Sequence, residues 1–291
     1  MSNEVFLAAL IGGPVVLGLC DLYERWRMPP ERERAAASAG GVLFLGVVLA
    51  VYVGIQGLAG RLAPGPREVV ARVSGALGGG ADGAAGWAIA LGVLVGLYAG
   101  GLADYLMHRW VSHARAFWVT HEYHHLPNEV FLLMPGLAAR PFAVVASFPV
   151  TVATAGAAYG TLALCGQPLG TATPMQWLLI MHVMLLVTSH SSFLRRFRAV
   201  HVWMKRFGLT TAREHLLHHT TDLAGNFANL TTVWDRVFGT YLDPDVVSME
   251  GRRLGLAYDQ DWLGAVTLSL LKLPPRWRAR FDVGRWCNLG S

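Results

Sequence analysis

Apolar residues gather into five long stretches that occupy most of the first two thirds of the chain. The stretches cover residues 5–20, 36–60, 84–103, 142–165 and 176–189. A bilayer core about 30 Å thick needs roughly 20 apolar residues in a helix, and the middle three stretches reach that length. The fifth is shorter, and a Gly-Gly-Pro sequence at residues 12–14 predicts that the first is kinked or only partly inserted. The pattern predicts an all-α integral membrane helical bundle with four or five spans.

The chain becomes more polar after residue 194, which indicates a helical cap outside the bilayer. An apolar run at residues 262–273 is too short to span and is followed by an Arg- and Trp-containing segment at 274–280. Such a pair is typical of an interfacial helix, although a buried helix of the cap fits equally well. We divide the chain into N-terminal membrane segments with a loop (1–83), a histidine-rich core (84–245) and a C-terminal tail (246–291).

Composition supports a membrane protein and excludes several other classes. Hydrophobic residues make up 53% of the 291 residues and charged residues only 15%, against about 25% charged residues in typical soluble domains. The net charge of +5 comes without a nucleic-acid-binding motif, so we expect contact with anionic lipid headgroups and no nucleic-acid partner. The three cysteines are scattered without CxxC spacing, which argues against a disulfide framework and a cysteine metal site.

Basic residues in the loops predict the orientation. Four arginines follow the first stretch, the loop between the fourth and fifth stretches is uncharged, and five basic residues follow the fifth stretch. The positive-inside rule then places the N-terminus outside and the C-terminus inside, although Arg61, Arg67 and Arg72 oppose this arrangement. Residues 108–125 and 190–219 fall together on the cytoplasmic side of a bacterial inner membrane. The first stretch lacks the basic region of a signal peptide, so we expect it to be retained.

Histidine carries the chemical signal, because all eleven histidines lie between residues 108 and 219. The sequence His-x-x-His-His occurs twice, at residues 121–125 and 215–219. On an α-helix, positions i, i+3 and i+4 share one face, so the three rings of each copy can point the same way. Two such faces set against each other could hold two metal ions. A single copy could be an ordinary polar helix surface, but two copies with outlying histidines favour a metal site.

The outlying histidines differ in their promise as ligands. His108 and His113 are separated by about 140° on a regular helix, so either the helix is distorted or ends there, or the two bind different metals. His190 ends the fifth stretch and is expected to be a ligand. His182 lies about 12 Å deeper along the helix and suits packing or a substrate cavity. His201, expected in a loop before the second copy, is a weaker ligand candidate.

The number of imidazoles favours two metals over one. A structural zinc uses four ligands in a closed tetrahedral site, fewer than this chain offers. Imidazole suits zinc, iron and copper, so spacing alone does not select iron over zinc. Iron would make placement in a membrane useful, because it activates O₂ against the unreactive C–H bonds of lipids.

The histidine pattern resembles that of the fatty acid hydroxylase/sterol desaturase superfamily. The similarity includes Asn226-Phe227-Ala228-Asn229 and the ending Trp234-Asp235-Arg236-Val237-Phe238-Gly239-Thr240-Tyr241, and it covers about residues 90–245. It implies a membrane-embedded non-haem di-iron oxygenase with two iron ions, or zinc in a purified form. The metal ligands implied by the resemblance are His108, His113, His121, His124, His125, His190, His215, His218 and His219.

The resemblance implies hydroxylation of a C–H bond of a fatty acyl or sterol-like lipid with O₂. The chain has no flavin, dinucleotide or iron–sulfur motif, so electrons are expected from a separate ferredoxin, cytochrome b5-like protein or flavin reductase. Many superfamily members have three residues between the first two histidines. The four here are similar to the fatty acid 2-hydroxylase and carotenoid hydroxylase branches, but the further histidine pair usual in those branches before the last box is absent from this chain.

Several other functions fit the same residues. Within the superfamily, the alternatives are a lipid desaturase and a carotenoid hydroxylase with the same chemistry. A di-zinc membrane hydrolase, in which metal-bound water attacks an ester or amide, would usually include carboxylate ligands, and the all-histidine set disfavours it. A metal-binding or transport protein without catalysis would spread its histidines through the membrane, whereas here His182 is the one placed well within a span.

Overall fold

The computed structural model describes residues 3–27, 83–126, 143–261 and, with gaps at 262, 265–266 and 268, residues 263–276. Within these residues the protein is helical, with two isolated β-bridges and no strand. The predicted span at 36–60, the arginines at 61, 67 and 72, and the end of the tail lie outside the described residues.

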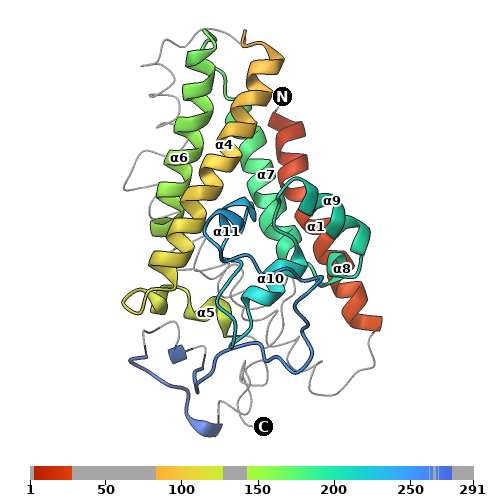
Figure 1. Ribbon diagram of the computed structural model, residues 1–291, viewed down its shortest axis with the longest axis vertical. Coiled ribbons are helices and arrows are strands. Elements are labelled where there is room, and N and C mark those ends of the chain that lie inside the picture. The colour runs from red at the N-terminus through yellow and green to blue at the C-terminus, as the bar shows by residue number, and fades with distance from the viewer. Residues whose placement is uncertain are drawn as a thin grey trace.

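Four long helices form the upper part of the molecule (Figure 1). They are α1 (Asn3–Arg27), α4 (Gly86–Leu106), α6 (Ala143–Leu164) and α7 (Thr173–His190). Each coincides with a predicted apolar stretch. Helix α1 is longer than the stretch predicted for it, and it continues through Pro14. A proline inside a helix removes one backbone hydrogen bond, and here it does not end the helix.

The outer surface of the bundle is apolar. Two of the described helical segments, Glu4–Glu24 and Gly86–Ser112, are long and apolar enough to cross a membrane. Only 12% of the first apolar window and 39% of the second are buried in the protein. Large side chains such as Leu19, Trp87 and Phe148 are exposed on three different helices. An apolar surface of this extent indicates a membrane environment, while the number of spans stays a prediction.

Small residues let α4 and α6 approach closely. Gly92 and Gly96 are one helical turn apart on α4, and both face α6. A β-carbon at Gly92 would lie 3.0 Å from the carbonyl oxygen of Ala158, and one at Gly96 would lie 3.0 Å from that of Thr154. Stripes of small residues allow this backbone contact between helices in membranes. The contact holds α4 in a fixed position, and α4 continues directly into η1 (Met107–Ser112), where the first histidine lies.

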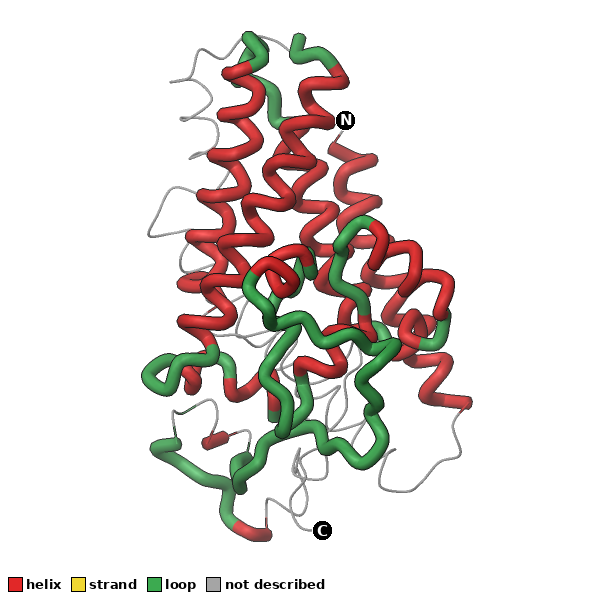
Figure 2. Tube along the Cα trace, viewed as in Figure 1, coloured by secondary structure: helices red, strands yellow, loops and turns green. Residues whose placement is uncertain are grey.

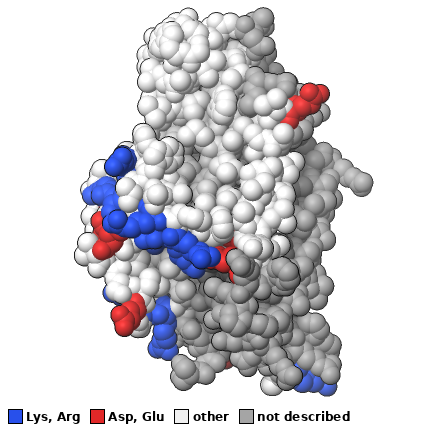
Figure 3. Space-filling model, turned by 90° about the vertical axis from the view of Figure 1, so that its right-hand side faces the viewer, with Lys and Arg blue, Asp and Glu red and all other residues white. Residues whose placement is uncertain are grey.

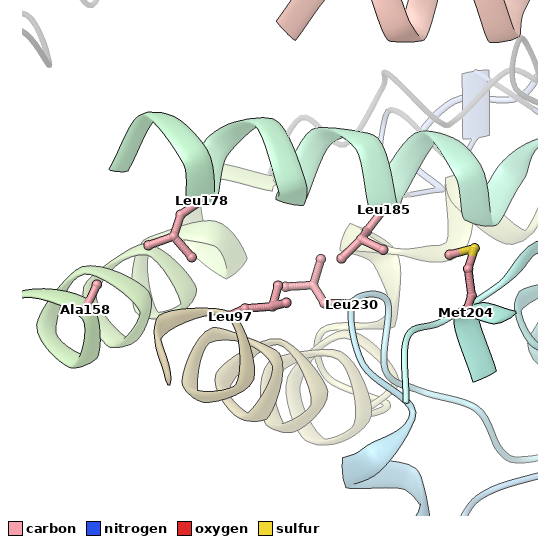
Figure 4. Packing of buried hydrophobic residues seen from close by; sticks show 6 residues of the cluster. All are labelled: Leu97, Ala158, Leu178, Leu185, Met204 and Leu230. Carbon is pink, nitrogen blue, oxygen red and sulfur yellow. The ribbon is translucent and has the colours of Figure 1, made fainter. Parts of the chain in front are cut away.

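A buried apolar cluster joins the long helices to the rest of the chain. Its members come from α4, α6, α7, α9 (Arg198–Arg206) and the segment before α11 (Val233–Val237), and they are Leu97, Ala158, Leu178, Leu185, Met204 and Leu230 (Figure 4). The cluster therefore fixes the cap against the bundle.

The cap consists of short helices and loops that lie against the lower halves of the long helices and beneath them (Figure 2). Its helices are η1 (Met107–Ser112), η2 (Trp118–Thr120), α5 (Glu122–His125), α8 (Ser192–Arg195), α9, α10 (Ala212–His218) and α11. Figure 3 shows Lys and Arg side chains in a band on one face, beneath a surface with almost no charge. The exposed Arg196, Arg198 and Arg206 belong to the segment of α8 and α9.

Candidate metal centre

The structure brings all nine histidines of the predicted ligand set together below the long helices. They form a five-histidine group (His108, His113, His121, His125 and His218) and a four-histidine group (His124, His190, His215 and His219). Within each group, one nitrogen of every ring lies within 4.8 Å of the others. Two compact sets of imidazoles, without a carboxylate or thiol among the described members, could each hold a metal ion.

Each His-x-x-His-His sequence contributes to both groups. The i and i+4 rings of α5 and its N-cap, His121 and His125, enter the five-histidine group, with 3.0 Å between their Nε2 atoms. The matching pair of α10 and its C-cap, His215 and His219, enters the four-histidine group, also at 3.0 Å. The middle ring of each sequence crosses to the other group. The predicted pairing of two helix faces is therefore present, but the three rings of one face do not share one group.

A π-helical turn brings His108 and His113 together. The backbone N–H of His113 donates to the carbonyl oxygen of His108 at 3.0 Å, which is the i+5 pattern of the π-helix η1. The wider turn places residues five apart on the same side, so their Nε2 atoms are 3.3 Å apart. Of the two sequence-based alternatives, the distorted helix is therefore the one found, and both rings enter one group. π-Turns inside α-helices are frequent at functional sites.

Of the other three histidine candidates, one belongs to a group and two do not. His190, at the end of α7, lies 2.9 Å from His215 between Nε2 atoms and belongs to the four-histidine group. The expected loop position of His201 is wrong, because His201 lies within α9. Its Nδ1 is 2.9 Å from the hydroxyl of Thr211, and it belongs to neither group. His182, half-buried in α7, is also outside both groups.

Backbone carbonyls fix which ring nitrogens face the centre. Nδ1 of His108 donates to the carbonyl of Phe227, Nδ1 of His190 to that of Leu186 at 2.7 Å, and Nδ1 of His218 to a further carbonyl at 3.0 Å. A carbonyl only accepts, so in the neutral ring the proton is on Nδ1 and the lone pair is on Nε2. Lone pairs that converge in this way fit a cation, and the donor set suits iron, zinc or copper.

Burial keeps the ring of His219 in the neutral form that binds metal. All four members of the four-histidine group are at most 1% exposed. Burial lowers the pKa of His219 well below 6.5, and the neighbouring rings of His215 and His218 lower it further. A neutral imidazole is the metal-binding form. The site is therefore prepared for metal ions at neutral pH.

The Asn226–Asn229 sequence orients the first histidine. The carboxylate of Asp104 accepts the backbone N–H of Asn229 at 2.8 Å and its amide N–H at 3.0 Å, next to the ring of His108. Asp235 accepts the N–H groups of Phe227 and Ala228 at 2.8 and 3.0 Å. Burial raises the pKa of Asp235 to about 6, against the effect of these hydrogen bonds. The two carboxylates hold the segment 226–229, and the Phe227 carbonyl in this segment orients His108.

A capping box fixes the start of α10. Thr211 caps the helix, and Glu214, three residues later, accepts the backbone N–H of Thr211 at 3.1 Å. Tyr241 donates its hydroxyl hydrogen to Glu214 at 3.2 Å. This reciprocal cap satisfies backbone donors at the helix start, and it sets the rotation of the helix that carries three of the grouped histidines.

Comparison with protein families identifies the class. The fatty acid hydroxylase family model matches residues 93–240, about half of the chain. The chain belongs to the fatty acid hydroxylase family. Neither the curated proteins nor the solved structures include a match to it. Membership of this family implies an oxidoreductase, and with the two apolar helices it indicates a membrane protein.

The N-terminal helix contributes to the site although it lies outside the residues matched to the family. Asp21 of α1 is fully buried and accepts hydrogen bonds from the hydroxyl of Ser191 at 2.7 Å and from the N–H groups of Ser192 and Phe193 at 3.1 and 3.2 Å. These residues follow His190 directly. Sequence reasoning missed Asp21, and a buried acidic residue at the end of an apolar stretch was the available signal.

Glu24, one turn beyond Asp21, strengthens the same contact. It accepts the hydroxyl of Ser192 at 3.0 Å and pairs with the exposed guanidinium of Arg196 at 3.0 Å. Together the two carboxylates fasten α1 to the turn between α7 and α8. We call Asp21, Glu24, Ser191 and Ser192 the α1 clamp.

The C-terminal tail also reaches the site from outside the family match. The hydroxyl of Tyr258 donates to Glu122 at 2.5 Å and accepts from the indole N–H of Trp118 at 2.6 Å. The amide of Gln260 donates to the same carboxylate at 3.0 Å. Glu122 is the first residue of α5, so the tail is anchored on the helix that carries His124 and His125 and follows His121.

A pocket of about 560 Å³ opens onto the five-histidine group. His113, His125 and His218 line it, whereas no member of the four-histidine group does. The other walls come from residues 109–118, 220–227 and 255–258. Its volume lies within the range of small-molecule sites. Among the described residues, the pocket therefore borders the five-histidine group and not the four-histidine group.

Proposed function

We propose that the chain is a membrane-bound non-haem di-iron oxygenase that hydroxylates a C–H bond of a fatty acyl or sterol-like lipid. The supporting observation is the pair of adjacent all-imidazole groups beneath an apolar bundle, in a chain of the fatty acid hydroxylase family. The balanced reaction converts R–H, O₂, two electrons and two protons into R–OH and water. Bound iron would supply the redox chemistry that activates O₂.

The chain's residues position and shield the reaction. The nine histidines named above would hold two iron ions, and the carbonyl of Phe227 and the carboxylate of Asp104 orient the ring of His108. The pocket would hold the substrate carbon beside His113, His125 and His218. Holding reacting groups at a fixed distance lowers the activation barrier. The burial of the four-histidine group would keep bulk water away from the metal ion that it holds.

Placement in the membrane follows from the surface. The basic band in Figure 3 lies beneath the uncharged surface of the bundle, and basic residues mark the cytoplasmic end of membrane helices. We propose a bacterial inner-membrane protein with four or five spans and a cytoplasmic site. A separate ferredoxin, cytochrome b5-like protein or flavin reductase would supply the electrons.

Two alternatives use the same site. Loss of a second hydrogen from the substrate would give an alkene, which makes the chain a desaturase, and a carotenoid would be a different substrate for the same hydroxylation. A di-zinc hydrolase is disfavoured, because no carboxylate belongs to either described group.

Metal content and O₂ use test the proposal. Protein purified without oxygen from iron-supplied cells should hold about two irons per chain, with the Mössbauer signals of a coupled ferric pair after exposure to O₂. A reductant and lipid should then cause O₂ uptake and a gain of one oxygen atom in the product. Two tightly held zinc ions from the same cells, with no O₂ uptake, would refute the oxygenase and favour the hydrolase.

A further inference from the structure

The pocket beside the five-histidine group carries a single kind of charge among its described lining residues. Arg109 is the charged side chain that lines it, and no aspartate or glutamate does. Arg109 directly follows His108, so its positive charge lies next to the histidines that would hold a cation. An arginine is always protonated at physiological pH. The pocket would therefore place the Arg109 charge near that of a bound metal ion, and no described aspartate or glutamate of its lining would balance them.

The guanidinium of Arg109 is held in place by neutral groups. It lies 5.8 Å from the ring centres of Tyr105 and Phe227 and 5.7 Å from that of Trp110. One of its N–H groups donates to the hydroxyl of Tyr105 at 2.5 Å. No described carboxylate forms an ion pair with it. A guanidinium has five N–H donors, so a rigidly positioned fork remains able to bind an anion in the pocket.

The remaining walls suit a hydrocarbon chain. Trp110, Trp118, Leu223 and Leu256 line the pocket with apolar surface. One fixed cation beside these apolar walls, in a pocket that also has threonine and histidine side chains, suits a molecule with an acidic end and an apolar body. An acyl lipid with a carboxylate or phosphate headgroup has this chemistry. A neutral sterol or a carotenoid would leave the partly buried charge without a counter-ion, which is costly.

We propose that Arg109 binds the acidic headgroup of an acyl lipid, so that the carbons next to the headgroup lie against His113, His125 and His218. This inference rests on the proposed function for its chemistry, but the binding step stands on the pocket alone. The same pocket borders both Arg109 and the histidines. The oxidised carbon would therefore be close to the headgroup rather than at the far end of the chain.

Binding of brominated lipids tests the charge preference without turnover. Bromine quenches tryptophan fluorescence at short range, and Trp110 and Trp118 line the pocket. Iron-loaded protein in detergent, kept anaerobic, is titrated with 2-bromohexadecanoic acid and with its uncharged methyl ester. A charge-assisted contact predicts roughly tenfold or greater preference for the acid. A 2-bromoacyl lysophosphatidic acid forms a second arm, which distinguishes a phosphate headgroup from a carboxylate.

Three variants connect the preference to Arg109. Arg109→Gln should lose the preference for the acid, so that acid and ester bind equally. Arg109→Lys should keep most of this preference. Arg206→Gln removes an exposed arginine of α9 and should behave as wild type. Leu256→Trp should fill the pocket and weaken both ligands. Equal binding of acid and ester by the wild type, or an unchanged preference in Arg109→Gln with normal metal content, would overturn the inference.

The two proposals fail separately. Absence of O₂ uptake with an intact acid preference would refute the oxygenase proposal but support the anion site. Normal lipid oxidation without an acid preference would remove the anion site and leave the oxygenase.

Discussion

The two histidine groups differ in access. Three rings of the five-histidine group face a pocket, and His113 is partly exposed. The four-histidine group is buried throughout and borders no part of that pocket. A substrate entering the pocket meets one group first. Under the proposed function, the open group would receive the substrate and the enclosed group would hold the second metal ion of the pair.

The groups also depend on different parts of the chain. Asp104 and Asn229, both within the family match, orient His108 of the open group. The enclosed group depends on the α1 clamp, because Asp21 binds the turn that follows His190. A substitution outside residues 93–240 can therefore disturb one histidine group and leave the other unchanged.

Removal of a ligand should give the largest effect. His215→Ala takes away the ring that contacts His190 and His219 at 2.9 and 3.0 Å. We expect lipid oxidation to fall about 100-fold or more and iron to fall from about two to about one per chain, because a lost ligand costs more than the 10–100-fold of a lost outer partner. Elemental analysis and product formation measure both. His182→Ala, which replaces a half-buried histidine of α7 outside both groups, should keep both metal ions.

Chelation should separate the two groups in time. A small chelator can enter the pocket, whereas release from the enclosed group requires local opening of the protein. We expect two phases of metal loss, the first at least about ten times faster. Stopped-flow absorbance of the coloured chelate follows the loss, and His215→Ala should lack the slow phase. A single phase in the wild type would show that access does not distinguish the groups.

Loss of the Asp21 charge should weaken the enclosed group alone. Asp21→Asn leaves one acceptor oxygen where two now bind three donors. We expect the affinity of the slowly released metal to fall about tenfold, as for other outer partners of a metal ligand. Chelator competition measures it. Glu24→Gln, which changes the outer and more exposed half of the clamp, should lower it less, and an equal loss from both groups would contradict the comparison.

The smallest effect is expected from the pocket wall. Tyr258→Phe removes the hydroxyl that joins Glu122 to Trp118. One hydrogen bond contributes about 1 kcal/mol, so KM for the lipid should rise about fivefold while kcat stays nearly constant. Steady-state kinetics provide the test. Tyr159→Phe, which loses a hydroxyl bonded to the carbonyl of Thr171 at 2.8 Å, is the matched control away from the pocket.

Much of the site could be predicted from sequence because it is local. The i+3 and i+4 spacings in the two His-x-x-His-His sequences place rings on helix faces, and both sequences entered the cluster. The apolar stretches likewise predicted α4, α6 and α7, since helix formation in a long apolar run needs no distant partner. The exchange of His124 and His218 between groups was not predictable, because it depends on how α5 and α10 lie against each other.

The missed residues are those whose role comes from distant contacts. Asp21 binds residues 170 positions or more away, and Tyr258 binds Glu122 across 136 positions. Nothing in their local sequence reports these partners. His201 was misplaced in a loop because its helix α9 is short and begins just three residues after α8 ends.

The π-helical turn between His108 and His113 has a consequence for sequence comparison. Residues four apart on an α-helix and five apart on a π-turn occupy equivalent positions, because the π-turn accommodates one extra residue. The deletion of one residue in η1 would therefore convert a His-x4-His spacing into His-x3-His without moving either ring from the cluster. Superfamily members with either spacing can therefore share one arrangement of the two rings. A one-residue gap in a sequence alignment at this helix would correspond to a change between a π-turn and an α-turn.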